Sequence, residues 1–290
     1  MNLTSPILIP AVIAGVCWLI SWRLWDRQHL ASRGHWGGAL ALALGYAAGY
    51  ASLMGWPPFP ANTAVQWLVY LAPLAGAVAL AEPLWRKNIW LRVSVWLGLG
   101  ALTAWLQFQA LVEHTWATPQ ALQWIGGLAL ATAALCAALD ALAERRDGAS
   151  LPLALWLTAA VTSGVLLLTK SALLGQLAGS LAGIFGAAAV LAWWAPGIRL
   201  SRGAMTVFGL LFVALLSQGH LYSELSFFGA ALLYLAPFAA WLGEVGLVKG
   251  LRPSRAVMVR MALVAIPLAV ALLIAFLEWR ESSAVGDYQY

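Results

Sequence analysis

Residues 151–194 read LPLALWLTAAVTSGVLLLTKSALLGQLAGSLAGIFGAAAVLAWW, and the division of this stretch decides the number of helices. It is apolar on both sides of Lys170, and one membrane-spanning helix takes roughly 20 residues. We expect two helices, 151–168 and 171–194, joined by a turn at Lys170. A single long helix is the alternative, but it would move Arg199 and Arg202 to the opposite side of the membrane.

The composition of the whole chain indicates a membrane protein. Its 290 residues are 62% hydrophobic and 9% charged, whereas an average soluble domain is about half apolar and a quarter charged. We therefore expect an all-α, polytopic bundle of about ten transmembrane helices that forms a single integral membrane domain, residues 1–290. The expected helices are 6–25, 37–55, 64–85, 89–111, 121–143, 151–168, 171–194, 204–222, 226–248 and 256–278.

The basic residues predict the orientation, because Lys and Arg accumulate in cytoplasmic loops. All but two of the 16 fall in alternate connections, and Lys170 and Arg280 are the exceptions. The orientation rests on Arg23, Arg27, Arg33, Arg86, Lys87, Arg92, Arg145, Arg146, Arg199, Arg202, Lys249, Arg252, Arg255 and Arg260. A wrong helix count would scramble this alternation, so we expect both termini on the non-cytoplasmic side, in a bacterial inner membrane.

The net charge of +5 does not indicate a nucleic-acid partner. That interpretation needs a basic patch on a soluble face, whereas these basic residues lie singly or in small groups between apolar runs. We expect the lipid bilayer as the main partner and leave membrane-protein partners and homo-oligomers open. Cys17 and Cys136 lie inside apolar segments and are interpreted as core residues. No cofactor and no metal site are expected.

Two patterns concern packing and duplication. Gly175, Gly179 and Gly183 are spaced by four, which leaves a groove where another helix can approach closely. A flexible gating helix is the alternative. The tetrapeptide Tyr-Leu-Ala-Pro occurs at 70–73 and again at 234–237, and whether it reflects a duplication stays open.

Ionisable groups inside a membrane are the usual functional candidates, and the central parts of the ten segments carry none. Polar residues gather instead near the expected outer face. The catalytic candidates are His220, Glu224, Glu113, His114 and Lys170, and the substrate-binding candidates are Gln107, Gln176, Gln218, Tyr222 and Thr162. If their helix continues, His220 and Glu224 share one face and could act as an acid/base pair. Alternatively they are ordinary loop residues, one of them paired with Lys170.

Three functions agree with these patterns. The first is a permease- or flippase-like protein that handles an apolar or amphipathic solute. The second is a non-catalytic membrane subunit that anchors or assembles a complex. The third is an enzyme that acts on lipid-linked substrates at the outer leaflet. Convergence of the outer polar residues around a cavity would favour the carrier or the enzyme, and their scatter around the rim would favour the subunit.

Overall fold

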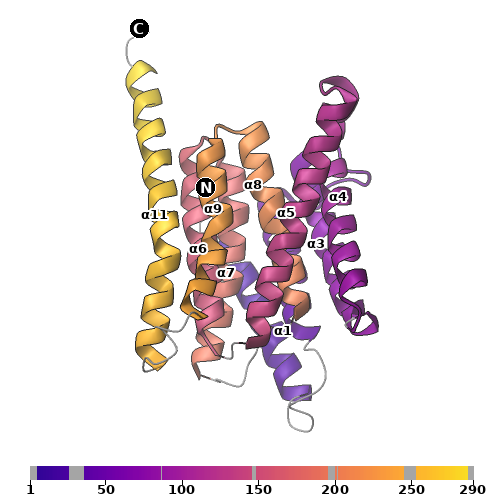
Figure 1. Ribbon diagram of the computed structural model, residues 1–290, viewed down its shortest axis with the longest axis vertical. Coiled ribbons are helices and arrows are strands. Elements are labelled where there is room, and N and C mark those ends of the chain that lie inside the picture. The colour runs from indigo at the N-terminus through magenta and orange to yellow at the C-terminus, as the bar shows by residue number, and fades with distance from the viewer. Residues whose placement is uncertain are drawn as a thin grey trace.

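The computed structural model of the protein is an all-helical bundle (Figure 1). It describes residues 5–25, 36–85, 87–145, 148–194, 200, 202–244 and 253–286, and no strand occurs in these ranges. The helices are α1 (Ser5–Trp25), α2 (Trp36–Met54), α3 (Ala64–Ala81), α4 (Ile89–His114), α5 (Thr118–Arg145), α6 (Ser150–Leu168), α7 (Ala172–Trp194), α8 (Arg202–Tyr222), α9 (Phe227–Ala239) and α11 (Pro253–Gly286), with short 3-10 helices η1 (Glu82–Leu84) and η2 (Ala240–Glu244). The expected all-helical fold is confirmed.

Eight of these helices are long and apolar enough to cross a membrane. In the other two, the described apolar part is shorter: it covers Pro6–Ser21 in α1 and Phe227–Gly243 in α9 with η2. Helices that follow one another along the chain run in opposite directions (Figure 1). We call the end at which α4 and α8 finish, and α3, α5, α7 and α9 begin, the upper end, and the opposite one the lower end.

The hairpin in residues 151–194 is confirmed. Helix α6 ends at Leu168 and α7 begins at Ala172. Lys170 takes the left-handed conformation with φ of 61°, which is uncommon for a side-chain-bearing residue and typical of a tight reversal. The Ser171 amide donates to the Leu166 carbonyl at 3.2 Å and closes the turn.

Several predicted boundaries need correction. Arg92 and Arg260 were expected in loops, but they lie inside α4 and α11. Arg260 is buried, and its guanidinium donates to the Gly243 carbonyl at 3.3 Å. Helix α4 begins at Ile89, as expected, and the Asn88 side chain accepts from the amides of Trp90 and Leu91, a typical N-terminal cap.

Other differences concern helix ends. Helix α4 continues three residues beyond the expected Leu111, and α11 continues beyond Glu278 to Gly286. The ninth segment changes to a 3-10 helix at Ala240, and its expected residues 245–248 lie outside the described ranges. The side chains of these topology residues also lie outside the described part: Arg23, Arg27, Arg33, Arg86, Arg146, Arg199, Arg202, Lys249, Arg252 and Arg255.

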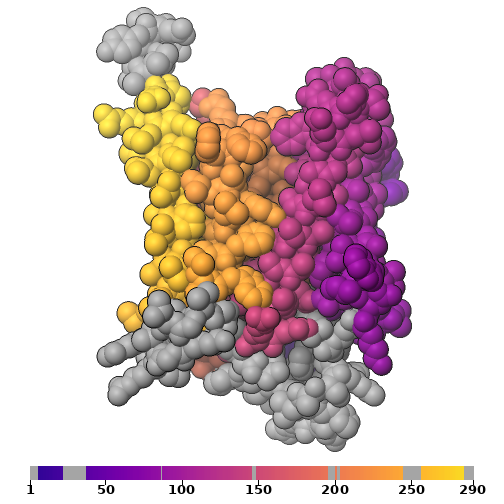
Figure 2. Space-filling view, in the orientation of Figure 1, coloured from indigo at the N-terminus to yellow at the C-terminus, as the bar shows by residue number. Residues whose placement is uncertain are grey.

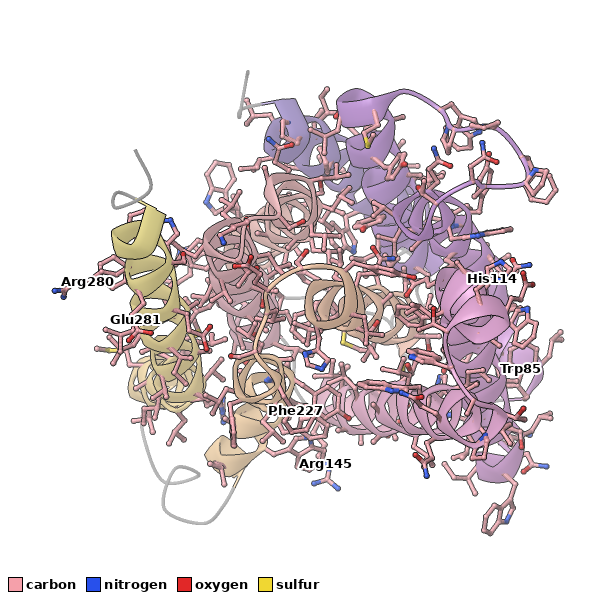
Figure 3. The ribbon with its side chains drawn as sticks, turned by 90° about the horizontal axis from the view of Figure 1, so that it is seen from above. Trp85, His114, Arg145, Phe227, Arg280 and Glu281 are labelled. Carbon is pink, nitrogen blue, oxygen red and sulfur yellow. The ribbon has the colours of Figure 1, made fainter. Side chains whose placement is uncertain are left out.

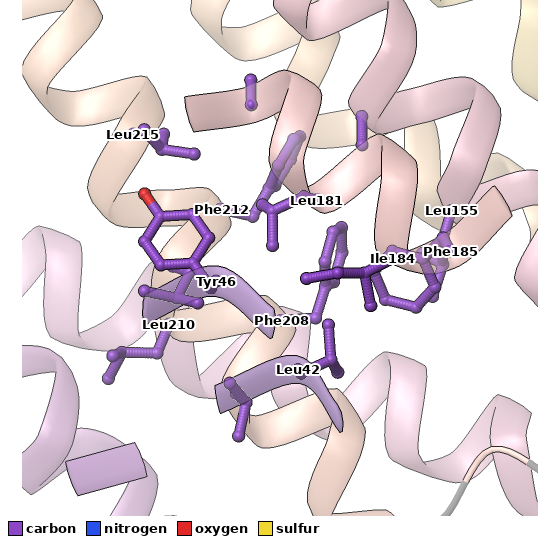
Figure 4. Packing of buried hydrophobic residues seen from close by; sticks show 14 of the residues in the cluster. Leu42, Tyr46, Leu155, Leu181, Ile184, Phe185, Phe208, Leu210, Phe212 and Leu215 are labelled. Carbon is purple, nitrogen blue, oxygen red and sulfur yellow. The ribbon is translucent and has the colours of Figure 1, made fainter. Parts of the chain in front are cut away.

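Helix α8 forms the centre of the bundle, and nearly all of its span is buried. Its aromatic side chains pack against one another and against α7 (Figure 4). The ring centroids of Phe208 and Phe212 are 5.1 Å apart, as are those of Phe208 and Phe185. Such contacts fix α8 against its neighbours, since aromatic pairs at this separation add to the stabilisation from burial.

Small residues let α1 approach the middle of α7. A Cβ atom at Gly183 would overlap the Ile7 carbonyl oxygen, and the Ser180 hydroxyl donates to the Pro6 carbonyl at 2.8 Å. Helix α1 therefore begins beside the middle of α7 and not at the upper end. Gly175 faces α6 instead, where an added Cβ would lie 2.6 Å from Leu167 Cγ.

Candidate functional site

A pocket of about 560 Å³ lies at the upper end, among α3, α4, α7 and α8. Its polar lining residues are Asn62, Thr63, Gln107, Gln109, Glu113, His114, Ser171, Gln218, Tyr222 and Ser223. Figure 2 shows that the upper surface is lower over α8 and α9 than over the neighbouring turn between α4 and α5. The polar residues of four separate chain segments thus converge on one cavity.

Two buried glutamines form the inner part of this pocket. Gln107 is 2% exposed, and neither atom of its amide has a hydrogen-bond partner among the described residues. Gln218 is fully buried; its Nε2 donates to the Ala64 carbonyl at 3.0 Å, but its Oε1 has no partner there. A buried amide without hydrogen bonds costs about 1–3 kcal/mol. Both residues line the pocket, and each has at least one amide atom without a partner among the described residues.

A kink in α4 lies beside Gln107. Phe108 departs from helical geometry, with φ of −113° and ψ of 18°. The Tyr222 hydroxyl donates to the Gln107 carbonyl at 3.2 Å, and the rings of Tyr222 and Phe108 stack at 5.8 Å. A side chain that enters the backbone hydrogen-bond ladder is a recognised cause of such kinks. The end of α8 thus fixes the part of α4 that carries the amide.

The start of α3 forms the opposite wall. Gln66 Oε1 accepts from the backbone amides of Asn62 and Thr63, at 2.8 and 3.3 Å. This contact satisfies amides that have no partner within the helix. It also holds the Ala64 carbonyl in position for Gln218.

The rim of the pocket is formed by exposed residues of the last turns of α4. Gln109 Nε2 donates to Glu113 Oε1 at 2.7 Å, and His114 lies beside them in sequence. No Lys or Arg occurs among the residues that line the pocket. Glu113 therefore gives the rim a negative charge, and His114 is the single lining residue that could carry a positive one.

His220 and Glu224 do not share a helical face, because α8 ends at Tyr222. Glu224 pairs with Lys170 at 2.8 Å, and both side chains are more than half exposed. His220 Nδ1 lies 2.9 Å from the Leu225 carbonyl oxygen, and its ring packs between Trp124 and Phe227. In Figure 3, seen from the upper end, His114 lies apart from Phe227, so the two histidines do not meet.

The remaining substrate-binding candidates divide between two places. Gln107, Gln218 and Tyr222 line the pocket, whereas Gln176 and Thr162 are buried elsewhere. Sequence reasoning missed Asn62, Thr63, Trp67, Ser171 and Ser223, which also line it. The spacing of Thr63 and Gln66 could have indicated this wall of the pocket, because it is typical of a capping box at a helix start.

The lower end holds a second polar cluster that the sequence did not indicate. Arg92 on α4 forms an ion pair with Asp140 on α5, whose side chains are 12% and 3% exposed. The guanidinium also lies 5.0 Å from the ring centre of Trp96, and Trp96 Nε1 donates to Thr206 Oγ1 at 3.0 Å. These contacts join α4, α5 and α8 below the pocket.

Within the described ranges, no group of three His, Cys, Asp or Glu side chains is arranged to hold a metal ion. Comparisons with protein-family models, with curated proteins and with solved structures found no match to the chain.

Proposed function

We propose that the protein is a multi-pass membrane protein that takes an amphipathic solute into the pocket at its upper end, in the manner of a permease or flippase. The observation that carries this proposal is the pair of buried glutamines, Gln107 and Gln218, which line one cavity and whose amides have atoms without a hydrogen-bond partner among the described residues. A polar head group that bonds to them would remove the cost of their burial.

The membrane setting is supported by the eight long apolar helices and by many large apolar side chains on the surface of α1 and α11. Lys87 and Arg145 lie at the lower end, because α4 begins and α5 finishes there. Cationic loops stay in the cytoplasm, so the proposed orientation places the pocket and both termini on the non-cytoplasmic side. A bacterial inner membrane is part of this proposal.

The pocket opens at one end, which suits one state of an alternating-access carrier. The ion pair of Arg92 with Asp140 and the hydrogen bond of Trp96 with Thr206 hold α4, α5 and α8 together at the other end. Leu106 and Ala110 supply apolar lining beside Gln107, where the first part of an alkyl chain can lie. Transport would require these lower contacts to separate.

The convergence of polar residues on a cavity favours the carrier over the subunit that only anchors partners. The enzyme remains a second candidate on one observation: Glu113 and His114 line the same pocket. A carboxylate and an imidazole are the usual groups for proton transfer.

The test uses the purified protein in vesicles that contain fluorescent amphiphiles with different head groups. A membrane-impermeant reductant bleaches the label in the outer leaflet, so translocation appears as loss of the protected fraction. We expect at least one amphiphile to move faster than in protein-free vesicles, Gln107→Met to abolish the increase, and Gln176→Met to keep it. Gln176 is the matched control because it is buried but does not line the pocket.

Equal rates for all amphiphiles with and without protein would refute the carrier. Mass spectrometry of the same vesicles separates the enzyme. Chemical change of an amphiphile that is lost in Glu113→Gln would replace the carrier with the enzyme.

A further inference from the structure

We infer that the pocket recognises an uncharged, hydroxyl-rich head group of the sugar or polyol class. This inference rests on the proposed function and names the substrate class of the same site.

The free atoms of the two amides select for a group that both donates and accepts hydrogen bonds. Gln107 offers donors on Nε2 and an acceptor on Oε1, and Gln218 offers an acceptor on Oε1. A hydroxyl carries one donor and two acceptor positions, so neighbouring hydroxyls can satisfy all three atoms. An ionised phosphate only accepts, and a quaternary ammonium does neither, so each would leave at least one amide atom without a partner.

The charge around the pocket also disfavours an anion. No Lys or Arg lines it, and Lys170, at the nearby turn, is paired with Glu224. Glu113 at the rim would repel a phosphate. A buried anion without a cationic partner carries a large desolvation cost.

Helix starts attract anions, and both α3 and α7 begin at the pocket. At α3, however, Gln66 Oε1 already accepts from the amides of Asn62 and Thr63. For these two amides at the start of α3, the acceptor that an anion would supply is therefore already present in the protein.

A cationic head group fits the rim better than the inner pocket. It could approach Glu113, which accepts from Gln109. In the inner pocket, however, an ammonium group only donates hydrogen bonds, so it would leave Gln107 Nε2 without an acceptor. Trp67 and Tyr222 also line the cavity, and aromatic side chains are common in small-molecule sites. The volume of about 560 Å³ lies within the range of small-molecule sites, roughly 300–1,000 Å³.

The experiment compares hexyl glucoside, hexyl phosphate and hexylamine, whose short chains limit partition into the bilayer. Binding to the purified protein in lipid nanodiscs is measured by calorimetry against empty nanodiscs. We expect hexyl glucoside to bind most tightly. Its affinity should fall about tenfold in Gln107→Met, which corresponds to the loss of about 1.4 kcal/mol, and should stay unchanged in Gln176→Met.

A second variant, Gln218→Met, keeps the test valid if Gln107→Met fails to fold. It should also lower the affinity for hexyl glucoside. Tightest binding of hexyl phosphate or hexylamine, or no binding of any of the three, would overturn the inference. If hexyl phosphate binds and Gln107→Met weakens it, the head group is wrongly assigned while the proposed function stands. If hexyl glucoside binds as expected but no amphiphile crosses the vesicle membrane, the inference stands and the carrier fails.

Discussion

Neutralising Asp140 should destabilise the bundle through the lower polar cluster. In Asp140→Asn the largely buried guanidinium of Arg92 loses its counter-charge. Removal of one partner from a buried pair costs about 3–5 kcal/mol. We expect a loss of about 3 kcal/mol in the free energy of unfolding, at the lower end of this range. The reason is that the contact of Arg92 with the Trp96 ring remains, and such a contact is itself worth about 0.5–2 kcal/mol.

The free energy of unfolding can be measured by titrating the protein in mild detergent with sodium dodecyl sulfate. The Cys17→Ala background leaves one thiol, Cys136, which is fully buried and lies 3.8 Å from the Met205 carbonyl on α8. Alkylation of this thiol therefore reports separation of α5 from α8. Lys87→Ala is the matched control, because it removes an exposed cation at the same end.

The double variant Arg92→Leu with Asp140→Leu should recover most of the loss. Replacement of a buried ion pair by apolar side chains is often neutral or stabilising, by about 1–4 kcal/mol. A loss below 1 kcal/mol in Asp140→Asn would contradict this account of the cluster, and so would a double variant as unstable as the single one.

Three further predictions use similar preparations. Gly183→Ala should lower the free energy of unfolding by about 1–3 kcal/mol, because the new Cβ would overlap the Ile7 carbonyl. Gly98→Ala is the control and should not lower it, because no atom lies within 4 Å of the new Cβ. Equal losses in the two variants would reject the close approach of α1 to α7. Lys170→Ala should change stability by less than about 1 kcal/mol, since exposed ion pairs contribute little, and should leave hexyl glucoside affinity unaltered; a calorimetric change would place Lys170 in the site. The orientation can be tested with single cysteines in a Cys17→Ala, Cys136→Ala background. A membrane-impermeant maleimide should label Glu113→Cys in intact spheroplasts and Lys87→Cys only after permeabilisation. The reverse pattern would invert the proposed orientation.

Much of the fold could be predicted because apolar length is a local property of the sequence. The division at Lys170 is an example, since a three-residue interruption between two apolar runs was enough to place the turn. Helix ends were harder. Helix α4 runs three residues beyond the expected end, to His114, and Arg260 lies inside α11, where its guanidinium donates to the Gly243 carbonyl. A count of apolar residues reveals neither the extra turn nor the contact.

The candidate site was predictable only in outline. Gln107 and Gln218 were among the binding candidates, because amides near the ends of apolar segments stand out. Their convergence depends on how α3, α4, α7 and α8 pack, which one sequence does not reveal. His220 and Glu224 do not pair, because the chain leaves the helix after Tyr222 and the imidazole contacts the Leu225 carbonyl oxygen instead.

The lower ion pair was missed for a related reason. Arg92 was interpreted as a loop cation that marks topology, and Asp140 lay near the end of an apolar segment where acids carry little topological weight. Only the packing of α4 against α5 makes them a buried pair.

The most direct test is a high-resolution structure of the protein with hexyl glucoside in the bilayer of a nanodisc. We predict density for the sugar in the upper pocket, with hydroxyl groups within hydrogen-bonding distance of the amides of Gln107 and Gln218. A sugar bound elsewhere, with both amides fully hydrogen-bonded to the protein, would contradict the assignment of this pocket as the solute site.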